Sequence, residues 1–254
     1  MSTTSTPTRR ERQRAATYDE IVEVSAALLD EGAELSLRAV AARMGMTAPA
    51  LYRYVSSYQE LVDLVAFELD KAATAEWAAE AERLPADDPA GRLTVACASF
   101  RRWALAKPRR FNLIFANPVA DPGAARQELL TQSSSGHYFT DLLWQIQDRY
   151  HFPYPSLDEL DPVVREAVLD PLIPAKAEHI DREDRGVLWV YMRSWSALYG
   201  VVTLESCGHC DPRVISSGQL FRATVIDWLG PLGLEDERER LVGLLDAELA
   251  KDRS

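Results

Sequence analysis

Two short helical segments separated by only three residues lie near the N-terminus, and this feature constrains the fold more than any other. Ser36 has the side chain of an N-cap for a helix over residues 37–44, and Thr47 has the side chain of an N-cap for a helix over residues 48–54. Gly45 favours an end to the first helix, because glycine adopts the left-handed conformation that helix C-termini require. The spacing therefore predicts two helices joined by a sharp turn.

The rest of the chain repeats helical spacing between glycine and proline stops. Apolar residues recur at steps of three and four, and no alternating strand pattern is longer than a few residues. The patterns predict helices at about 15–31, 57–83, 89–106, 108–116, 122–150, 182–206, 212–230 and 235–251. With 47% apolar residues, a chain of 254 residues can bury a sizeable core. We therefore expect an all-α fold.

Three parts of the chain differ in composition. Residues 1–14 form a basic arm, of which residues 1–12 offer no apolar face and are expected to be disordered unless DNA orders them. Residues 15–60 hold the three N-terminal helices, and residues 61–254 form a larger helical domain that the long helix at 57–83 joins to the first. The break from Pro85 to Pro89 is a further candidate boundary. The proline-rich segment 151–175 is the least regular part, with room for one short helix.

Charge is distributed unevenly along the chain. Residues 1–60 carry seven Arg against eight Asp or Glu, so nearly all of the net charge of −11 belongs to the remainder. The first 14 residues hold Arg9, Arg10, Arg12 and Arg14 against Glu11 alone. A short basic arm is typical of a segment that contacts phosphate, although a solvated tail that touches nothing has the same composition.

Several classes of protein are disfavoured. No run of about 18 uncharged apolar residues occurs, and the N-terminus lacks the apolar stretch of a signal peptide, so we expect a soluble cytoplasmic protein without membrane contact. The three cysteines do not suggest a disulfide framework. The chain has no Gly-rich phosphate loop, no His-Glu-x-x-His and no nucleophile elbow, so we expect neither an enzyme nor a cofactor.

The two short helices fit a helix-turn-helix, in which the second helix lies in the major groove and the first spans the backbone. The helical spacing turns five apolar residues inward: Leu37, Val40, Ala41, Leu51 and Val55. The residues that remain form a DNA-facing set: Thr47, Ala48, Pro49, Tyr52, Arg53 and Tyr54. The hydroxyl groups of this set suit phosphate oxygens, Arg53 suits phosphate or a guanine edge, and Arg38 is a further candidate for either. The alternative is an ordinary helical bundle with surface tyrosines.

These residues resemble the DNA-binding domain of the tetracycline-repressor-like (TetR) family of transcriptional regulators. The similarity covers about residues 15–65 and is carried by four stretches: Ser36 to Ala41, Gly45-Met46-Thr47, Leu51-Tyr52-Arg53-Tyr54-Val55 and Tyr58-Gln59-Glu60-Leu61. The resemblance implies that Ser36 and Tyr58 also belong to the DNA interface. Two positions depart from the family pattern: Val55 replaces a phenylalanine, and Tyr58 replaces a lysine that touches phosphate. The backbone amides at that helix start are the remaining phosphate ligands there.

The C-terminal part resembles a subgroup of the same family with a Trp-x-x-x-His-Gly motif. Trp195 to Gly200 and Pro108 to Phe115 occupy the corresponding places, with Tyr199 in place of the histidine. The resemblance implies a homodimer through the helices at about 182–206 and 212–230, a pocket beside them, and a palindromic operator in double-stranded DNA. Independently, apolar pockets favour aromatic linings, and the candidates for an effector site are Phe100, Trp103, Phe111, Phe115, Phe139, Trp144, Trp195 and Tyr199. Core packing is the alternative for each of them.

The expected function is therefore a ligand-responsive repressor that a small hydrophobic or aromatic effector releases from DNA. One alternative is a metal- or redox-responsive regulator, because Cys207, His209 and Cys210 offer three ligands within four residues. The other alternative is a helical interaction protein without specific DNA binding.

Overall fold

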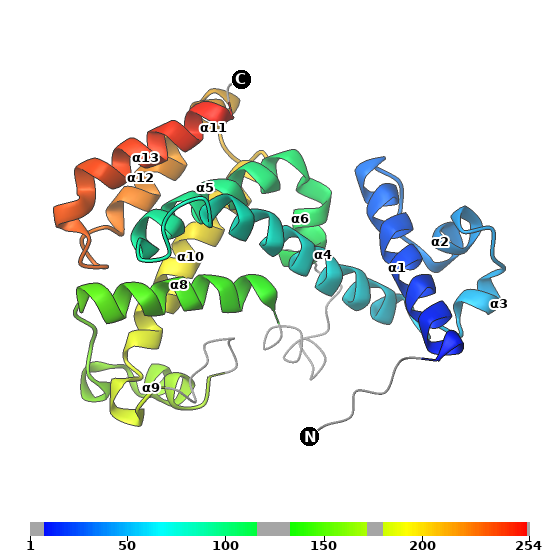
Figure 1. Ribbon diagram of the computed structural model, residues 1–254, viewed down its shortest axis with the longest axis horizontal. Helices are drawn as coiled ribbons and strands as arrows, with labels where there is room; N and C mark the ends of the chain where they lie inside the picture. The colour runs from blue at the N-terminus through cyan, green and yellow to red at the C-terminus, as the bar shows by residue number, and fades with distance from the viewer. Residues whose placement is uncertain (1–7, 116–132, 172–179, 253–254) are drawn as a thin grey trace. The chain divides into compact units, whose positions relative to one another are not determined.

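The computed structural model describes residues 8–115, 133–171 and 180–252, and every regular element within these ranges is helical (Figure 1). The all-α expectation is thus confirmed for this part of the chain. The helices form two compact units. None of the described helices combines the length and the apolarity needed to cross a membrane.

The first unit holds the N-terminal helices. It contains α1 (Arg9–Asp30), α2 (Leu37–Arg43) and α3 (Ala48–Leu51), with parts of α4 (Tyr58–Ala81) and α6 (Pro108–Phe115). Helix α4 contributes its residues up to Leu69, and α6 contributes its residues from Arg109. One residue from each of the first four helices is fully buried in a shared core: Ile21, Val40, Leu51 and Leu61. Burial of such side chains stabilises the unit by about 1.5–3 kcal/mol each.

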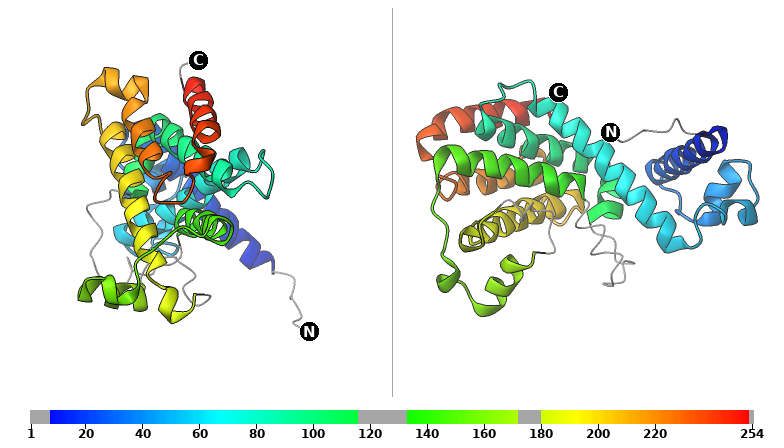
Figure 2. Two further views of the ribbon diagram at one scale, coloured as in Figure 1. Left: turned by 90° about the vertical axis from the view of Figure 1, so that its left-hand side faces the viewer. Right: turned by 60° about the horizontal axis from the view of Figure 1, so that its bottom comes forward.

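The second unit is a larger helical assembly (Figure 2). It contains α4 from Asp70 onward and the helices α5 (Pro89–Ala106), α8 (Ser134–Tyr150), α9 (Pro162–Leu169), α10 (Val187–Ser206), α11 (Pro212–Ser217), α12 (Gln219–Asp227) and α13 (Arg238–Lys251). Helix α5 packs against α8, α10 and α13. Short 3-10 turns occur at Leu157–Glu159, Arg182–Asp184 and Glu235–Glu237.

Three helices of the second unit begin with the same dipeptide, Asp-Pro. The aspartate is the N-cap, and its carboxylate accepts a hydrogen bond from a main-chain amide in the first turn: Gly91 N to Asp88, Val163 N to Asp161 and Arg213 N to Asp211. The proline follows in the first turn, where no amide is needed. These starts follow directly from the sequence.

The N-terminal arm was expected to be disordered, and this expectation is wrong from Arg9 onward. Helix α1 begins at Arg9 because Thr8 and Glu11 form a capping box, in which each side chain accepts the main-chain amide hydrogen of the other residue. The hydrogen bond from the Thr8 amide is the main cause that lowers the pKa of Glu11. Residues 1–7 of the expected arm lie outside the described residues.

Other differences concern helix limits. The expected helix at 212–230 is two helices, because Gly218 adopts a left-handed conformation with a φ of +66° between α11 and α12. The expected helix at 48–54 is regular only to Leu51 and continues as turns. Of the helix expected at 122–150, the part Ser134–Tyr150 is observed, and residues 122–132 lie outside the described ranges. Of the proline-rich segment 151–175, the described part 151–171 holds one short α-helix, α9, as expected, and residues 172–175 lie outside the described ranges.

The division of the chain also differs from the expected boundaries at residue 60 and at Pro85 to Pro89. The first unit ends at Leu69, inside α4, and takes in α6 from Arg109. Leu113 and Ile114 of α6 pack against the core of the first unit, which explains why a later segment of the chain joins it. A helix that runs through two units leaves no break in the sequence to mark the boundary.

Candidate functional site

The turn between α2 and α3 is held by main-chain hydrogen bonds. The amide of Met46 donates to the oxygen of Ala41 at 2.8 Å, and the amide of Gly45 donates to the oxygen of Ala42 at 3.2 Å. This Schellman arrangement needs a left-handed residue, and Gly45 supplies it with a φ of +66°. At the other end of α2, the Ser36 hydroxyl accepts from the Ala39 amide and acts as N-cap. The helix-turn-helix geometry therefore follows from glycine and serine at these positions.

Burial separates the two faces of the helix-turn-helix. Val40, Ala41, Leu51 and Val55 are at most 2% exposed, as the inward spacing predicted, and Leu37 is half-buried. The outward residues are exposed or half-exposed: Arg38, Thr47, Ala48, Pro49, Tyr52 and Arg53. Tyr52 is 51% exposed although its ring is large and apolar.

The Thr47 side chain does not cap α3, which corrects one expectation. Thr47 is the N-cap residue by position, but its hydroxyl makes no capping hydrogen bond. It is exposed at the start of the recognition segment, which we define as residues 47–54. A hydroxyl that does not serve the helix remains free to hydrogen-bond a phosphate oxygen.

Tyr54 lies differently from the other members of the recognition segment. Its ring is half-buried and meets the ring of Tyr18 of α1 edge-on, with centroids 5.6 Å apart and an interplanar angle of 85°. The Tyr18 hydroxyl donates to the main-chain oxygen of Tyr54 at 3.1 Å. Tyr18 was missed at the sequence level, where it resembled one more residue on the apolar side of an amphipathic helix.

The four arginines of the arm are exposed on the first turns of α1. The guanidinium of Arg14 donates to the Tyr18 hydroxyl at 3.0 Å and lies 5.6 Å from the centre of the Tyr18 ring. The hydrogen bond to Tyr18 is the main cause that raises the pKa of Arg14, and the Tyr54 phenol contributes electrostatically. Arg14 is therefore near the end of the recognition segment, although the two are distant in the sequence.

The start of α4 has little capacity for an anion. The Ser57 hydroxyl already accepts from the Glu60 amide at 3.1 Å, and the Glu60 carboxylate accepts from the amide and the hydroxyl of Ser56. The two hydrogen bonds from Ser56, and first of all the one from its hydroxyl, lower the pKa of Glu60. They therefore hold a negative charge at the helix start. Tyr58 is 40% exposed beside it. A carboxylate at this place repels phosphate, so the phosphate role of this helix start loses support.

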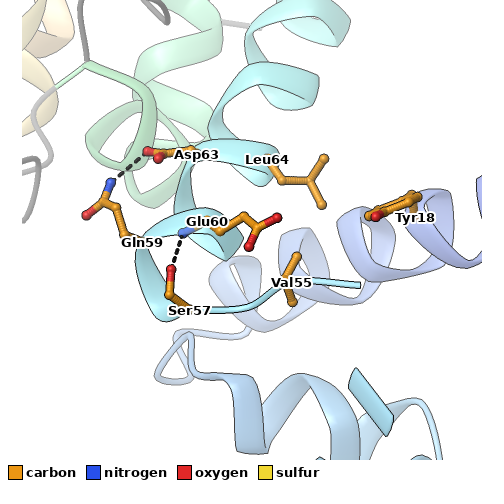
Figure 3. Close-up of a pocket in the computed structure, with 7 residues that line it drawn as sticks. All are labelled: Tyr18, Val55, Ser57, Gln59, Glu60, Asp63 and Leu64. Atoms are coloured by element: carbon orange, nitrogen blue, oxygen red, sulfur yellow. Dashed lines mark hydrogen bonds between the residues drawn. The ribbon is translucent and has the colours of Figure 1, made fainter. Parts of the chain in front are cut away.

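A pocket of about 400 Å³ lies in the same unit (Figure 3). Figure 3 shows Tyr18 and Leu64 toward one side, with Gln59 and Asp63 at the other. The lining residues are Tyr18, Val55, Ser57, Gln59, Glu60, Asp63 and Leu64. Gln59 donates to Asp63 at 2.7 Å. The carboxylates of Glu60 and Asp63 make the pocket unsuitable for phosphate. Tyr18 lines the pocket and also packs against the core of the first unit.

Five of the eight expected effector-site residues belong to one aromatic cluster in the second unit. Phe100, Trp103 and Phe139 are buried, whereas Trp195 and Tyr199 are half-buried. The ring of Trp195 stacks on Phe100 at 5.9 Å and on Tyr199 at 6.1 Å.

Trp77 of α4 connects the cluster and was missed from the expected set. Its ring lies 5.0 Å from Phe100, 5.6 Å from Trp103 and 6.1 Å from Phe139. The side chain is 1% exposed, and its indole nitrogen has no hydrogen-bond partner among the residues that the structure describes. At the sequence level, the regular spacing of α4 made Trp77 look like ordinary core.

The other three expected effector residues lie elsewhere in the structure. The ring of Trp144 packs edge-on against Tyr191 at 5.6 Å, within a different hydrophobic core. Phe111 and Phe115 belong to the first unit, where their rings lie 5.2 Å apart.

The cysteine and histidine cluster has a structural explanation. Cys207, Gly208 and His209 form the C-terminal cap of α10, in which the His209 amide donates to the oxygen of Leu204 at 2.8 Å and Gly208 has a φ of +68°. Among the described residues, no group of three or more His, Cys, Asp or Glu side chains is placed to hold a metal ion. Cys97 is buried, and burial raises its pKa to about 12, which makes its thiol unreactive.

Comparison with known proteins gives similarity along most of the chain. A family model described as the tetracyclin repressor-like C-terminal domain matches residues 93–227, which is more than half of the chain. Two proteins named as HTH-type transcriptional regulators, Rv1816 of Mycobacterium tuberculosis (strain H37Rv) and Mb1846 of Mycobacterium bovis, are each 39% identical over 95 residues. The aligned stretch covers 36% of this chain and only 40% of each relative.

A solved structure extends the similarity to the fold as a whole. The crystal structure described as "putative regulatory protein SCO4313" matches with a TM-score of 0.61 and a sequence identity of 25%. The match covers 88% of this chain and 100% of that chain. The uncovered share is smaller than either unit, so the fold similarity includes parts of both units.

Proposed function

Because the chain belongs to the tetracyclin repressor-like family, we propose that it is a transcriptional regulator that binds operator DNA through α2, the turn and the recognition segment. It acts in the cytoplasm, where its DNA lies. The protein represses, and a small apolar or aromatic effector bound in the second unit releases it from the operator.

One observation carries the proposal: the two faces of the helix-turn-helix differ in burial. Four side chains that hold the unit together are at most 2% exposed, while the outward face presents small, polar and basic side chains with the 51% exposed ring of Tyr52 among them. A recognition helix needs such side chains because larger apolar ones would keep the backbone away from base edges.

Each exposed residue has a role that its chemistry supports. Arg53 pairs with a phosphate or with the O6 and N7 atoms of guanine, and Thr47 and Tyr52 donate to phosphate oxygens. Ala48 and Pro49 meet thymine methyl groups. Arg38, exposed at the start of α2, is a further phosphate ligand. Tyr54 is assigned a packing role, because its ring is held against Tyr18.

The protein acts as a homodimer through α10 and the pair α11 and α12. Two large apolar side chains on these helices are exposed in the single chain: Leu204 of α10 by 43% and Val214 of α11 by 39%. Apolar side chains at such positions favour burial against a second copy. Two-fold symmetry then places the recognition segments about one DNA turn apart and requires a palindromic operator.

The effector binds beside the half-buried rings of Trp195 and Tyr199. These two rings are the members of the aromatic cluster that retain accessible surface, while the buried rings of Phe100 and Phe139 form the cluster's base. Stacking on them favours planar or apolar molecules. Release from DNA requires that the effector bind one dimer conformation more tightly than the other.

The experiment that tests the function is a fluorescence-anisotropy titration against the DNA that flanks the protein's own coding region. It is run with excess non-specific competitor DNA and at two salt concentrations. We expect saturable binding that resists the competitor, and this assay then serves for an effector screen. Binding that the competitor or the higher salt abolishes calls for a selection from random sequences, and failure to select any common site would overturn the proposal.

A further inference from the structure

The hydroxyl group of Tyr18 makes two hydrogen bonds to elements that are separated in the sequence. It accepts from the guanidinium of Arg14 at 3.0 Å and donates to the main-chain oxygen of Tyr54 at 3.1 Å. One phenol therefore joins a basic side chain of α1 to the last residue of the recognition segment. Phenylalanine at this position could make neither bond.

The ring of Tyr18 is fixed by its surroundings. It packs edge-on against Tyr54 and lies against the hydrophobic core of the first unit, where Leu64 also packs. In Figure 3 the ring lies on the side of the pocket where Leu64 points. A ring held by packing gives its hydroxyl a fixed position, so the two hydrogen bonds have a rigid centre.

We propose that Tyr18 is a positioning residue for DNA recognition, whose hydroxyl holds the Arg14 guanidinium and the end of the recognition segment in one fixed arrangement. The inference rests on the proposed function of the helix-turn-helix. Arg14 is otherwise an exposed, flexible side chain, and ordering such a side chain at the moment of binding costs conformational entropy. Tyr18 removes part of that cost before DNA arrives. Arg14 then contributes a defined phosphate contact.

The matching surface on DNA is the phosphate backbone next to the base pairs that the recognition segment reads. A basic side chain tied to the end of that segment reaches the neighbouring phosphate and fixes the register of the protein on the duplex. The contact carries no sequence information of its own. Loss of the hydrogen bonds made by the Tyr18 hydroxyl therefore weakens binding to all operator sequences to the same degree.

The test uses the variant Tyr18→Phe in the full chain, titrated against the operator over a series of salt concentrations. We expect affinity to fall about tenfold, as for loss of hydrogen bonds to a charged group. The slope of log affinity against log salt should fall by about one, because one phosphate contact is no longer held. The ring and its packing remain, so the variant should stay folded, with an unchanged helical signal in circular dichroism.

Tyr154→Phe is the matched control. Its hydroxyl also makes one side-chain hydrogen bond, to Asp184 at 2.8 Å, but it belongs to the second unit. Removing it should leave both the affinity and the salt slope unchanged. A general effect of deleting one tyrosine hydroxyl would appear in both variants.

A double-mutant cycle with Arg14→Ala separates positioning from a purely structural role. Once Arg14 is absent, Tyr18→Phe should cost less than about twofold, because the contact that it positions no longer exists. An equal loss in both backgrounds, or an unchanged affinity and slope in the single variant, would overturn the inference. Failure of the unaltered protein to bind any operator would instead overturn the proposed function.

Discussion

Arg101 of α5 and Glu205 of α10 form an ion pair in the interior of the second unit, with 2.6 Å between Nε and Oε2. The side chains are 3% and 0% exposed. The same guanidinium donates to Asp252 at 2.7 Å and to the main-chain oxygen of Ile215 at 2.6 Å, and it lies over the ring of Phe221. One buried arginine thus connects α5, α10, α11, α12 and the end of α13.

Removal of this arginine should strongly destabilise the second unit. Arg101→Met leaves the Glu205 carboxylate buried without its partner, and breaking a buried pair in this way costs about 3–5 kcal/mol. The measurement is urea unfolding followed by circular dichroism, with the slope compared to exclude a change in the unfolded state. Arg83→Met is the control, because Arg83 pairs with Glu80 on the surface of α4 and its loss should leave the midpoint unchanged. Equal midpoints for both variants would show that the buried pair does not hold the unit together.

Glu205 makes stability depend on pH in a particular direction. Burial raises its pKa above the ordinary value of 4.5, and this effect exceeds the opposing influence of the Arg101 charge, while Asp252 raises the pKa further. The folded protein therefore holds this proton more strongly than the unfolded chain does. The stabilisation is complete below the unfolded pKa and is lost as pH rises through the folded pKa.

We therefore expect the free energy of unfolding of the unaltered protein to fall, relative to that of Glu205→Gln, as pH rises from about 4 to 7. In the comparison with the glutamine variant, the contributions of the other titrating groups to stability cancel, because both proteins contain them. Urea unfolding at several pH values measures the difference. A difference that stays constant, or that changes in favour of the unaltered protein, contradicts the expected direction.

The local signals in the sequence predicted the helix-turn-helix well. Ser36 caps α2, Gly45 ends it, and Val40, Leu51 and Val55 are buried as their spacing indicated. These features depend on neighbouring residues within one or two helical turns, so they are readable from the chain alone. The start of α1 was readable too, because Thr8 and Glu11 have the spacing of a capping box, but the surrounding arginines suggested disorder.

Features that depend on distant contacts could not be predicted. Gly218 interrupts the chain between α11 and α12, whereas Gly200 lies inside α10 without ending it, so glycine alone does not mark a break. A side chain at Gly218 would approach Leu249 of α13 within 3.2 Å, a constraint that appears only in the folded structure. Tyr18 and Trp77 were missed for the same reason. Their partners come from other helices.

Arg53 should be essential for operator affinity but not for assembly. Arg53→Ala removes an exposed side chain of the recognition segment and should weaken operator binding about tenfold or more, because good bidentate contacts contribute about 1–3 kcal/mol. Anisotropy titration measures the affinity, and analytical ultracentrifugation checks that the dimer is unchanged. Arg43→Ala is the control: Arg43 is exposed in the same unit but is held by Glu31. Equal losses of operator affinity in the two variants would show that Arg53 contributes only its positive charge and no specific contact.

Gly45 and Gly32 provide a matched pair for testing the turn of the helix-turn-helix. Both end a helix of the first unit with the same main-chain hydrogen bonds, and their φ angles are +66° and +76°. Alanine in this conformation costs about 1–2 kcal/mol, so both Gly45→Ala and Gly32→Ala should lower the free energy of unfolding. Among the described residues, a Cβ at Gly45 would meet nothing within 4 Å, and the atoms nearest to a Cβ at Gly32 belong to the flexible end of Arg109.

Their effects on DNA binding should differ. Strain at Gly45 acts on the turn that sets the recognition segment against α2, whereas strain at Gly32 acts before α2 begins. Gly45→Ala should therefore weaken operator binding by more than Gly32→Ala at a temperature where both variants are fully folded, which thermal unfolding establishes beforehand. If the two variants bind the operator equally, the α2 turn does not set the recognition segment, and the geometry of reading must be fixed elsewhere, with the contact between Tyr18 and Tyr54 as the next element to test.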